Sequence, residues 1–310
     1  MAILKPEEMD FSADNIIMII SGLPGVGKTT TACSAPNVAV IDTDNGMKRV
    51  NPQHRKETIS VSTYEELLND LKSEEIAKKD TLVFDTTGAF IELLKDWAMR
   101  NNPSACKKGG GISQNGFGIV KSEFLRISNE LRKKFNVIYM FHTSKKADKD
   151  GNPVYELMCE GAARELVWQP ADLGAYLQII DNKRYLCFSP TQEYSAKSSY
   201  GIKGLIAIPE LSDGEPNDFL TKLFEKVKTN IKAENEAFKP QKNAYKKAMT
   251  EGIELINSMT TSEEAAPIMN AIKKLEHSLT SEKELKAHFS DKLKELNIVW
   301  NKDKKAYEQQ

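Results

Sequence analysis

Residues 22–29 read Gly-Leu-Pro-Gly-Val-Gly-Lys-Thr, which is a complete G-x-x-x-x-G-K-[ST] motif. The motif follows an apolar run, Ile16–Ile20, that is typical of a buried strand, and it precedes Thr29–Cys33, which can begin a helix. A glycine-rich turn between a strand and a helix lets the backbone wrap a phosphate with several N–H donors. The order of strand, motif and helix therefore predicts a binding site for a nucleoside triphosphate.

Three side chains are expected to contact the triphosphate and its metal ion. Lys28 is predicted to bridge the β- and γ-phosphate oxygens, and Thr29 to coordinate Mg²⁺. Asp85 ends the apolar run Thr81–Asp85 and is the carboxylate predicted to hold Mg²⁺ through water. The predicted nucleotide-binding residues are Gly22, Pro24, Gly25, Val26, Gly27, Lys28, Thr29 and Thr30. ATP and Mg²⁺ are the expected cofactors.

Apolar runs alternate with helical patterns through the first two-thirds of the chain. The predicted strands are Ile16–Ser21, Val38–Asp42, Thr81–Asp85 and Val137–His142, and the predicted helices are Lys28–Ser34, Thr63–Lys72, Ala89–Met99 and Val120–Lys134. Strands separated by helices predict an α/β fold with a mainly parallel sheet covered on both faces. After residue 170 the pattern predicts an antiparallel hairpin, Leu173–Ile180 and Arg184–Phe188, and one more strand at Gly204–Ile208.

The last part of the chain has a different pattern. A predicted helix, Asp218–Lys232, leads to a polar break that contains Pro240, and residues 243–310 are predicted to be helical only. Apolar residues at helical spacing would form a small bundle there. We therefore expect two domains, an ATPase core of residues 1–239 and a helical C-terminal domain of residues 240–310.

The composition, with 40% apolar and 28% charged residues, is that of an ordinary soluble protein. No apolar run approaches the ~18 residues of a membrane span, and Met1–Glu8 lacks a signal-peptide layout, so we expect a cytoplasmic protein with no membrane partner. The four scattered cysteines predict reduced thiols. The net charge of −1 argues against a generally basic surface, yet residues 101–150 hold ten Lys and Arg against four Asp and Glu.

The group that would position the attacking water does not follow Asp85 directly, because Thr86 stands there instead of a glutamate. Asp44 is the candidate, since it follows the predicted strand Val38–Asp42. The segment Asp42-Thr-Asp44 resembles the RecA/RadA recombinase family, where an Asp-Thr-Glu-Gly-like sequence supplies a glutamate that orients the water. The aspartate is one methylene shorter. The alternative is a turn formed by Asp-Asn-Gly at residues 44–46.

Further segments extend this resemblance. Phe84–Thr87 is similar to the family's Asp-Ser/Thr segment, and Val137–Thr143 predicts a strand that ends in a polar residue, His142. The resemblance implies that His142 senses the γ-phosphate, whereas a purely structural histidine is the alternative. The ordered set resembles most closely the phage nucleotide-binding proteins of the Sak type, which are single-strand annealing ATPases on a RecA/RadA-like core. It covers residues 14–232 and leaves residues 240–310 outside.

The resemblance also implies two loops that meet single-stranded DNA, here Asn101–Gly118 and Ser144–Cys159. The expected DNA-binding residues are Lys107, Lys108, Phe117, Lys145, Lys146 and Lys149. Lysines contact phosphates without reading sequence, and an aromatic ring stacks on any base, so this set suits non-specific binding. The alternative is a surface that is basic by chance.

Lys197 lies in Tyr194-Ser-Ala-Lys197, where RecA-like proteins can project a basic residue toward a neighbouring subunit's γ-phosphate. A cation there stabilises the charge of the transition state, so hydrolysis would require a homo-oligomer, as a ring or a filament. A solvated loop lysine is the alternative. The C-terminal helices are expected to offer a surface to a single-strand-binding or replication protein.

The sequence therefore predicts a DNA-stimulated ATPase that acts on single-stranded DNA in phage-type recombination or annealing, in the host cytoplasm if it is phage-encoded. Two other functions stay open. One is a nucleotide-gated adaptor or loader with little hydrolysis, which the short Asp44 side chain favours. The other is a small-molecule P-loop phosphotransferase, against which the missing arginine-rich lid argues.

Overall fold

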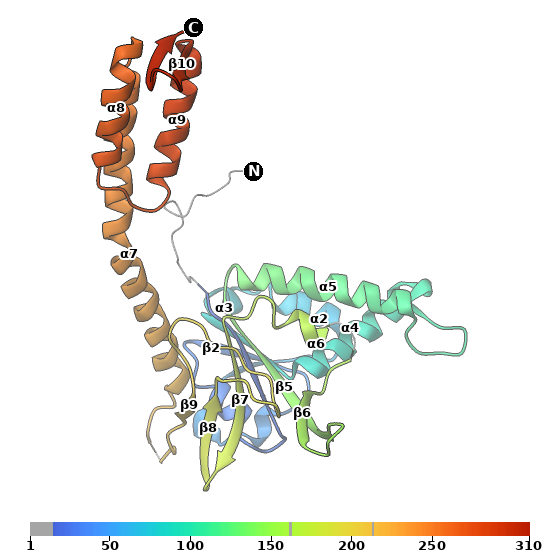
Figure 1. The fold of residues 1–310 in the computed structure, drawn as a ribbon. Helices are drawn as coiled ribbons and strands as arrows, with labels where there is room; N and C mark the ends of the chain where they lie inside the picture. The colour runs from blue at the N-terminus through green and yellow to red at the C-terminus, as the bar shows by residue number, and fades with distance from the viewer. Residues whose placement is uncertain (1–14, 161–162, 213) are drawn as a thin grey trace. The chain divides into compact units, whose positions relative to one another are not determined.

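The computed structural model describes residues 15–160, 163–212 and 214–310 (Figure 1). The chain divides into two compact units, one that ends at Asn230 and one that begins at Ile231. Met1–Glu8, on which the expectation about a signal peptide rests, lies outside the described residues. None of the described helices is both long and apolar enough to cross a membrane.

The first unit is built on a mixed sheet, in which nine strands are described. They are β1 (Ile17–Gly22), β2 (Val38–Asp42), β3 (Glu57–Ser60), β4 (Thr81–Asp85), β5 (Asn136–Ala147), β6 (Pro153–Leu157), β7 (Leu173–Ile180), β8 (Lys183–Cys187) and β9 (Leu205–Ala207). Their order is β3-β2-β4-β5-β1-β7-β8-β9, and β6 pairs with β5. The pairs from β3 to β7 are parallel, whereas β5–β6, β7–β8 and β8–β9 are antiparallel. The predicted mainly parallel sheet with a hairpin extension is confirmed.

Helices cover this sheet. They are α1 (Lys28–Ala32), α2 (Tyr64–Asp70), α3 (Glu74–Ala77), α4 (Thr87–Asn101), α5 (Gln114–Arg132) and α6 (Ala163–Leu166), with 3₁₀ turns at Met47–Arg49, Pro52–His54 and Pro103–Ala105. Tyr64 of α2, Phe90 of α4 and Phe124 of α5 join Phe84 and Tyr139 of the strands in the main core. Because β1, β2 and β4 are buried along their whole length, they appear in the sequence as unbroken apolar runs.

The strand order brings the predicted nucleotide site together. β5 lies between β1 and β4, and Gly22 of β1 is the register partner of His142 on β5. Asp42 of β2 is in turn the register partner of Asp85 on β4. Since the carboxyl ends of parallel strands meet at one edge of a sheet, the phosphate loop, Asp85 and the turn after Asp42 converge there.

β5 is longer than predicted. Residues 144–147 continue the strand as an antiparallel hairpin with β6, in which Lys145 is the partner of Tyr155. His142 therefore lies inside a strand and not at its end, which corrects the sequence-based expectation. The second predicted DNA loop is accordingly in large part this hairpin.

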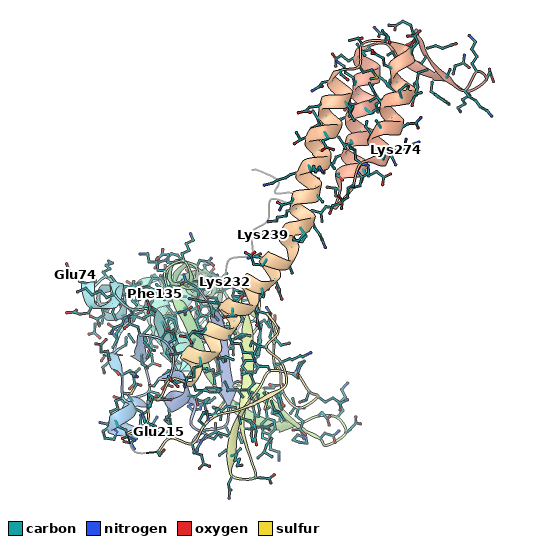
Figure 2. All side chains as sticks on the ribbon, turned by 90° about the vertical axis from the view of Figure 1, so that its left-hand side faces the viewer. Glu74, Phe135, Glu215, Lys232, Lys239 and Lys274 are labelled. Atoms are coloured by element: carbon teal, nitrogen blue, oxygen red, sulfur yellow. The ribbon has the colours of Figure 1, made fainter. Side chains whose placement is uncertain are left out.

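The second unit contains the C-terminal helices. α7 (Phe219–Asn257) runs through Pro240 without a break, and Lys239 lies within the uninterrupted helix (Figure 2). The predicted break is wrong, because a proline in a helix removes one N–H and one backbone hydrogen bond, which exposed neighbours can satisfy with water. α8 (Ser262–Lys274) and α9 (Ser281–Glu295) follow. The core of this unit is formed by Ile256, Met259, Ala265, Ile268, Ile272, Leu285 and Phe289.

The prediction of helices only is wrong for the last residues. β10 (Ile298–Asn301) and β11 (Ala306–Gln309) form an antiparallel hairpin in which Trp300 is the partner of Tyr307. The rings of these two residues are 4.8 Å apart, and Tyr307 also contacts Phe289 of α9. Cross-strand aromatic pairs stabilise such short hairpins. The division into domains at residues 239 and 240 stays a prediction.

Candidate active site

The phosphate loop joins β1 to α1 and depends on two glycines with positive φ. Gly25 has a φ of 80°, and Gly27, the residue before α1, has a φ of 103°. Side chains other than glycine rarely adopt these angles. The side chain of Arg184 also lies over Gly27, with Nε 3.0 Å from where a Cβ would be. The loop conformation therefore requires glycine at these positions.

Lys28 is held deep in the site. Its side chain is buried, and Nζ donates hydrogen bonds to the carbonyls of Gly22 (3.0 Å) and Leu23 (2.9 Å). Burial lowers the pKa of Lys28 to about 8, although the carboxylates of Asp85 and Asp44 oppose this shift. An ammonium that is poorly hydrated and close to the phosphate loop is suited to binding an anionic ligand.

Asp85 and Thr29 form the predicted metal pair. Thr29 Oγ1 donates a hydrogen bond of 2.7 Å to Asp85 Oδ2. Burial raises the pKa of Asp85 to about 6, and the nearby Asp44 and Asp42 raise it further, while the Thr29 hydrogen bond opposes the shift. The carboxylate and the hydroxyl thus lie together, as shared coordination of one ion requires.

Asp42 has a role that the sequence analysis missed. Its Oδ1 accepts a hydrogen bond from Gly46 N (2.8 Å), and its Oδ2 accepts one from Met47 N (3.0 Å). Thr43 N donates to the Asp85 carbonyl (2.8 Å) and joins this turn to β4. These bonds fix the turn that carries Asp44. An aspartate two residues before an Asp-Asn-Gly turn is the signal that could have indicated this role.

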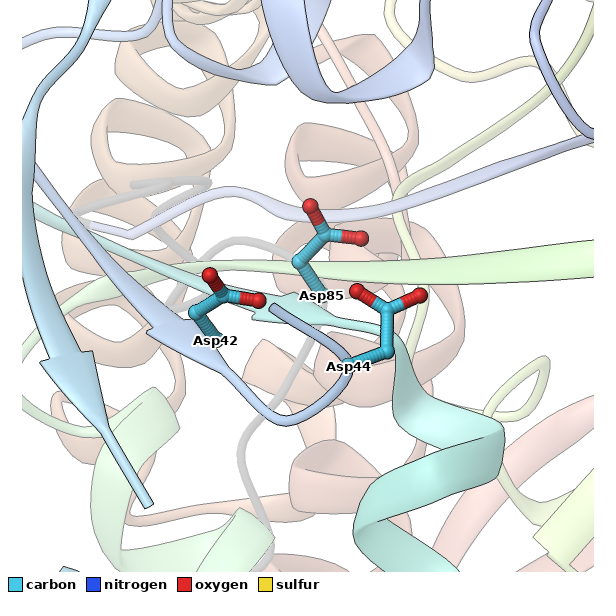
Figure 3. Close-up of side chains that lie close together, drawn as sticks. All are labelled: Asp42, Asp44 and Asp85. Carbon is cyan, nitrogen blue, oxygen red and sulfur yellow. The ribbon is translucent and has the colours of Figure 1, made fainter. Parts of the chain in front are cut away.

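Three carboxylates meet at this point, as Figure 3 shows: one oxygen from each of Asp42, Asp44 and Asp85 lies within 4.8 Å of the others. Asp44 Oδ1 is buried and makes no hydrogen bond with the described residues. A Cβ on Gly46 would lie 2.8 Å from this atom and 3.1 Å from Asp85 Oδ2, so the space between the carboxylates exists only because residue 46 is glycine. Mg²⁺ prefers one or two carboxylates together with phosphate oxygens, and the arrangement fits that preference.

His142 connects Lys28 to Asp44. Its Nδ1 is 3.0 Å from Lys28 Nζ, and its Nε2 is 3.7 Å from Asp44 Oδ2. Burial and the Lys28 charge lower the pKa of His142, so the ring is neutral near pH 7 and Nδ1 accepts the hydrogen bond from Lys28. The other Asp44 oxygen lies 3.6 Å from the guanidinium of Arg49, which the sequence analysis did not select.

Lys197 makes its described contacts elsewhere. Its backbone exchanges two hydrogen bonds of 2.8 Å with Gly174, and Nζ donates to the carbonyl of Trp168 (3.2 Å). None of its described contacts involves the phosphate loop of the same chain. Its role toward a neighbouring subunit stays a prediction.

The predicted DNA-binding residues do not form one cluster of free side chains. Lys145 and Lys149 are exposed, whereas Lys146 forms an ion pair with Glu156 (2.7 Å). Adjacent residues of a strand point to opposite faces, so Lys145 and Lys146 diverge. Phe117 lies in the first turn of α5 with Lys95 Nζ 5.5 Å from its ring centre, and the exposed Lys107 and Lys108 lie in the preceding loop.

The sequence matches the family described as AAA domain over residues 14–200. The chain belongs to this family. Its AAA domain includes the phosphate loop, the three carboxylates, His142 and Lys197. The first unit is therefore an AAA-type P-loop ATPase fold, which implies nucleotide binding, usually with Mg²⁺.

The AAA domain also has similar solved structures. One is the flagellar accessory protein FlaH from Methanocaldococcus jannaschii, with 13% identity and a TM-score of 0.30, covering 63% of this chain and 90% of FlaH. Another is an ATPase from the type III secretion system of pathogenic bacteria (12% identity, TM-score 0.35, 53% and 52%). A third is the ATPase domain of a further protein (15% identity, TM-score 0.32, 63% and 81%). No curated protein matches the sequence.

Proposed function

We propose that this protein binds ATP with Mg²⁺, hydrolyses it, and acts on single-stranded DNA as a member of the Sak-type annealing group. The observation that supports the enzymatic part is the convergence of Lys28, Thr29, Asp85, Asp44 and His142. The two carboxylates and His142 come from, or directly follow, three separate strands, yet they contact each other or the phosphate loop.

Each of these residues has a distinct chemical task. Lys28 neutralises the charge of the transferring phosphoryl group. Thr29 and Asp85 hold Mg²⁺, which supplies further neutralisation of the phosphate oxygens when it is bound. Asp44 orients the attacking water, and His142, between Lys28 and Asp44, positions both groups through its two ring nitrogens.

The test of this part is ATP binding and hydrolysis by Lys28→Ala. We expect the variant to lose triphosphate binding, because it lacks the cation directed at the β- and γ-oxygens. Lys72→Ala is the matched control, since this lysine is exposed on the surface. Unchanged ATP affinity and turnover in Lys28→Ala would contradict the proposal.

The DNA part rests on β5, which carries both His142 and the exposed Lys145. Together with Lys149 it offers positive charge near the nucleotide site without sequence-reading groups. The test is ATP turnover by the full chain with and without single-stranded DNA, with duplex DNA as the comparison. Equal turnover under all three conditions and no DNA retention would count against this part. Assembly into a ring or filament belongs to the same proposal.

A nucleotide-gated adaptor is a second candidate, and the contacts of Asp44 favour it. The carboxylate lies 3.6 Å from Arg49 and 3.7 Å from His142, so its charge is already engaged. A slow ATPase would then use the bound nucleotide to present the C-terminal helices to a replication or recombination protein. Tight ATP binding with turnover at the level of Asp44→Asn would support the adaptor over the ATPase.

A further inference from the structure

A cavity of about 300 Å³ lies directly beside the phosphate loop. Residues of the loop and α1 form one wall, and β8 together with the chain around β9 forms the other (Figure 1). The lining residues that matter here are Gly27, Thr30, Arg184, Ile208, Leu211 and Asn217. This volume is at the lower end for small-molecule pockets, which suits one nucleoside.

Arg184 forms a flat lid over one side of the cavity. Its Nε donates a hydrogen bond of 3.0 Å to the Val26 carbonyl, and its Cδ lies 3.3 Å from the position of a Cβ on Gly27. The planar guanidinium is thus anchored at the phosphate loop. Arginine in such a position stacks on an aromatic ring more favourably than lysine does.

The opposite side is partly apolar. Ile208, Pro209 and Leu211 line the cavity just after β9, and Ile208 N donates to the Arg184 carbonyl (2.9 Å), which joins this segment to β8. A heteroaromatic base between the guanidinium and these side chains would lose little hydration of its faces. The segment lies beyond residue 200, where the match to the AAA domain ends.

Asn217 supplies the polar group that distinguishes between bases. Its Nδ2 donates to the Thr30 carbonyl (2.8 Å), and this contact fixes the orientation of the amide because a carbonyl can only accept. Its Oδ1 accepts no hydrogen bond from the described residues. The free acceptor complements the exocyclic amine of adenine and repels the carbonyl oxygen at the same position of guanine.

We propose that this cavity is the nucleoside pocket of the site, with Arg184 stacking on the base and Asn217 selecting adenine over guanine. The inference rests on the proposed binding of ATP at the phosphate loop. It assigns base recognition to β8 and to residues 208–217, which the phosphate-loop motif does not include.

The test compares the affinities of ATP, GTP and inorganic tripolyphosphate, each with Mg²⁺, for the full chain. Tripolyphosphate carries the phosphates without a nucleoside. We expect wild type to bind ATP about tenfold more tightly than GTP, and more tightly than tripolyphosphate. Asn217→Leu should remove the preference for ATP over GTP. Unfolding temperatures measured in parallel would show whether each variant is folded.

Arg184→Leu should weaken ATP about tenfold and leave tripolyphosphate unchanged. Arg184→Lys keeps the charge without the plane, so it should not restore ATP affinity if stacking is the contribution. Lys183→Leu, an exposed neighbour on β8, is the matched control. Equal losses for ATP and tripolyphosphate in Arg184→Leu, with rescue by lysine, would overturn the inference, because Arg184 would then act on the phosphates.

Two wild-type results separate the inference from the proposed function. Equal affinities for ATP, GTP and tripolyphosphate would overturn the nucleoside pocket and leave triphosphate binding in place. No binding of any of the three would overturn the proposed function, and the inference with it.

Discussion

Gly46→Ala is the most informative single substitution in the candidate site. Gly46 has φ −69° and ψ −33°, angles that alanine adopts readily, so the backbone does not oppose the change. The added Cβ would however lie 2.8 Å from Asp44 Oδ1, and this atom must retreat by about 0.6 Å to reach the 3.4 Å of ordinary contact. Asp85 Oδ2, at 3.1 Å, is crowded as well.

The expected loss follows from the size of this displacement. A misplacement of about 1 Å in a catalytic group costs on the order of 10²-fold in rate, so we expect a fall in kcat of roughly 10- to 100-fold. That range corresponds to about 1.4–2.7 kcal/mol of lost transition-state stabilisation. The free energy of unfolding should change by less than about 1 kcal/mol, since the unfolded chain loses entropy with alanine.

The assay is steady-state ATP hydrolysis with thermal unfolding of the same samples. Gly118→Ala is the control: a Cβ there meets no atom within 4 Å, and α5 should gain helix propensity. If Gly46 acts through Asp44, the double variant with Asp44→Asn should be no slower than the slower single variant. Wild-type turnover in Gly46→Ala, or fully additive losses in the double variant, would refute the reasoning.

Three other predictions follow from the same geometry. Asp85→Asn should keep part of the ATP affinity and lose Mg²⁺-dependent turnover, measured by titrating Mg²⁺ at fixed ATP. The Asp85 pKa is raised from 3.8 to about 6 in the folded protein, so its contribution to stability increases as the pH falls from 7 toward 4; urea unfolding without Mg²⁺ should show this gain of up to ~3 kcal/mol in wild type and not in Asp85→Asn. Lys145→Ala with Lys149→Ala should lower the log–log salt slope of single-stranded DNA binding by up to ~1.4, and adding Lys146→Ala should change it little because Glu156 already pairs with Lys146. A slope equal to that of wild type in the double variant would move the DNA site away from this hairpin.

Sequence patterns predicted the central strands well because burial on both faces leaves a long apolar run. The strands β1, β2 and β4 have every residue buried, and their predicted bounds differ from the structure by at most one residue. β3 was not predicted, since only Ile59 of its four residues is buried and one apolar residue sets no period. β10 and β11 were missed because their pairing depends on contacts across the turn, such as Trp300 with Tyr307.

The site could be predicted only as far as residue type and order carry information. The motif identified Lys28 and Thr29, and strand order identified Asp85. The contact of His142 with Lys28 depends on the register of β1 against β5, in which Gly22 lies opposite His142. Pairing of distant strands is set by the whole core, so no local pattern contains it. For the same reason the sequence could not show that Lys146 is paired with Glu156 while Lys145 is free to meet solvent.

The ionisation of the site is the property furthest from the sequence, because burial causes it. Desolvation brings the pKa of Lys28 down to about 8 and that of Asp85 up to about 6, so both groups move toward neutral pH in the free protein. Bound triphosphate would raise the pKa of Lys28, and a cation at Asp85 would require the ionised carboxylate. Each residue therefore gains stabilisation of its charged form only when its ligand binds. A site with this arrangement costs folding stability when it is empty, and that cost favours occupation by both ligands together over either one alone.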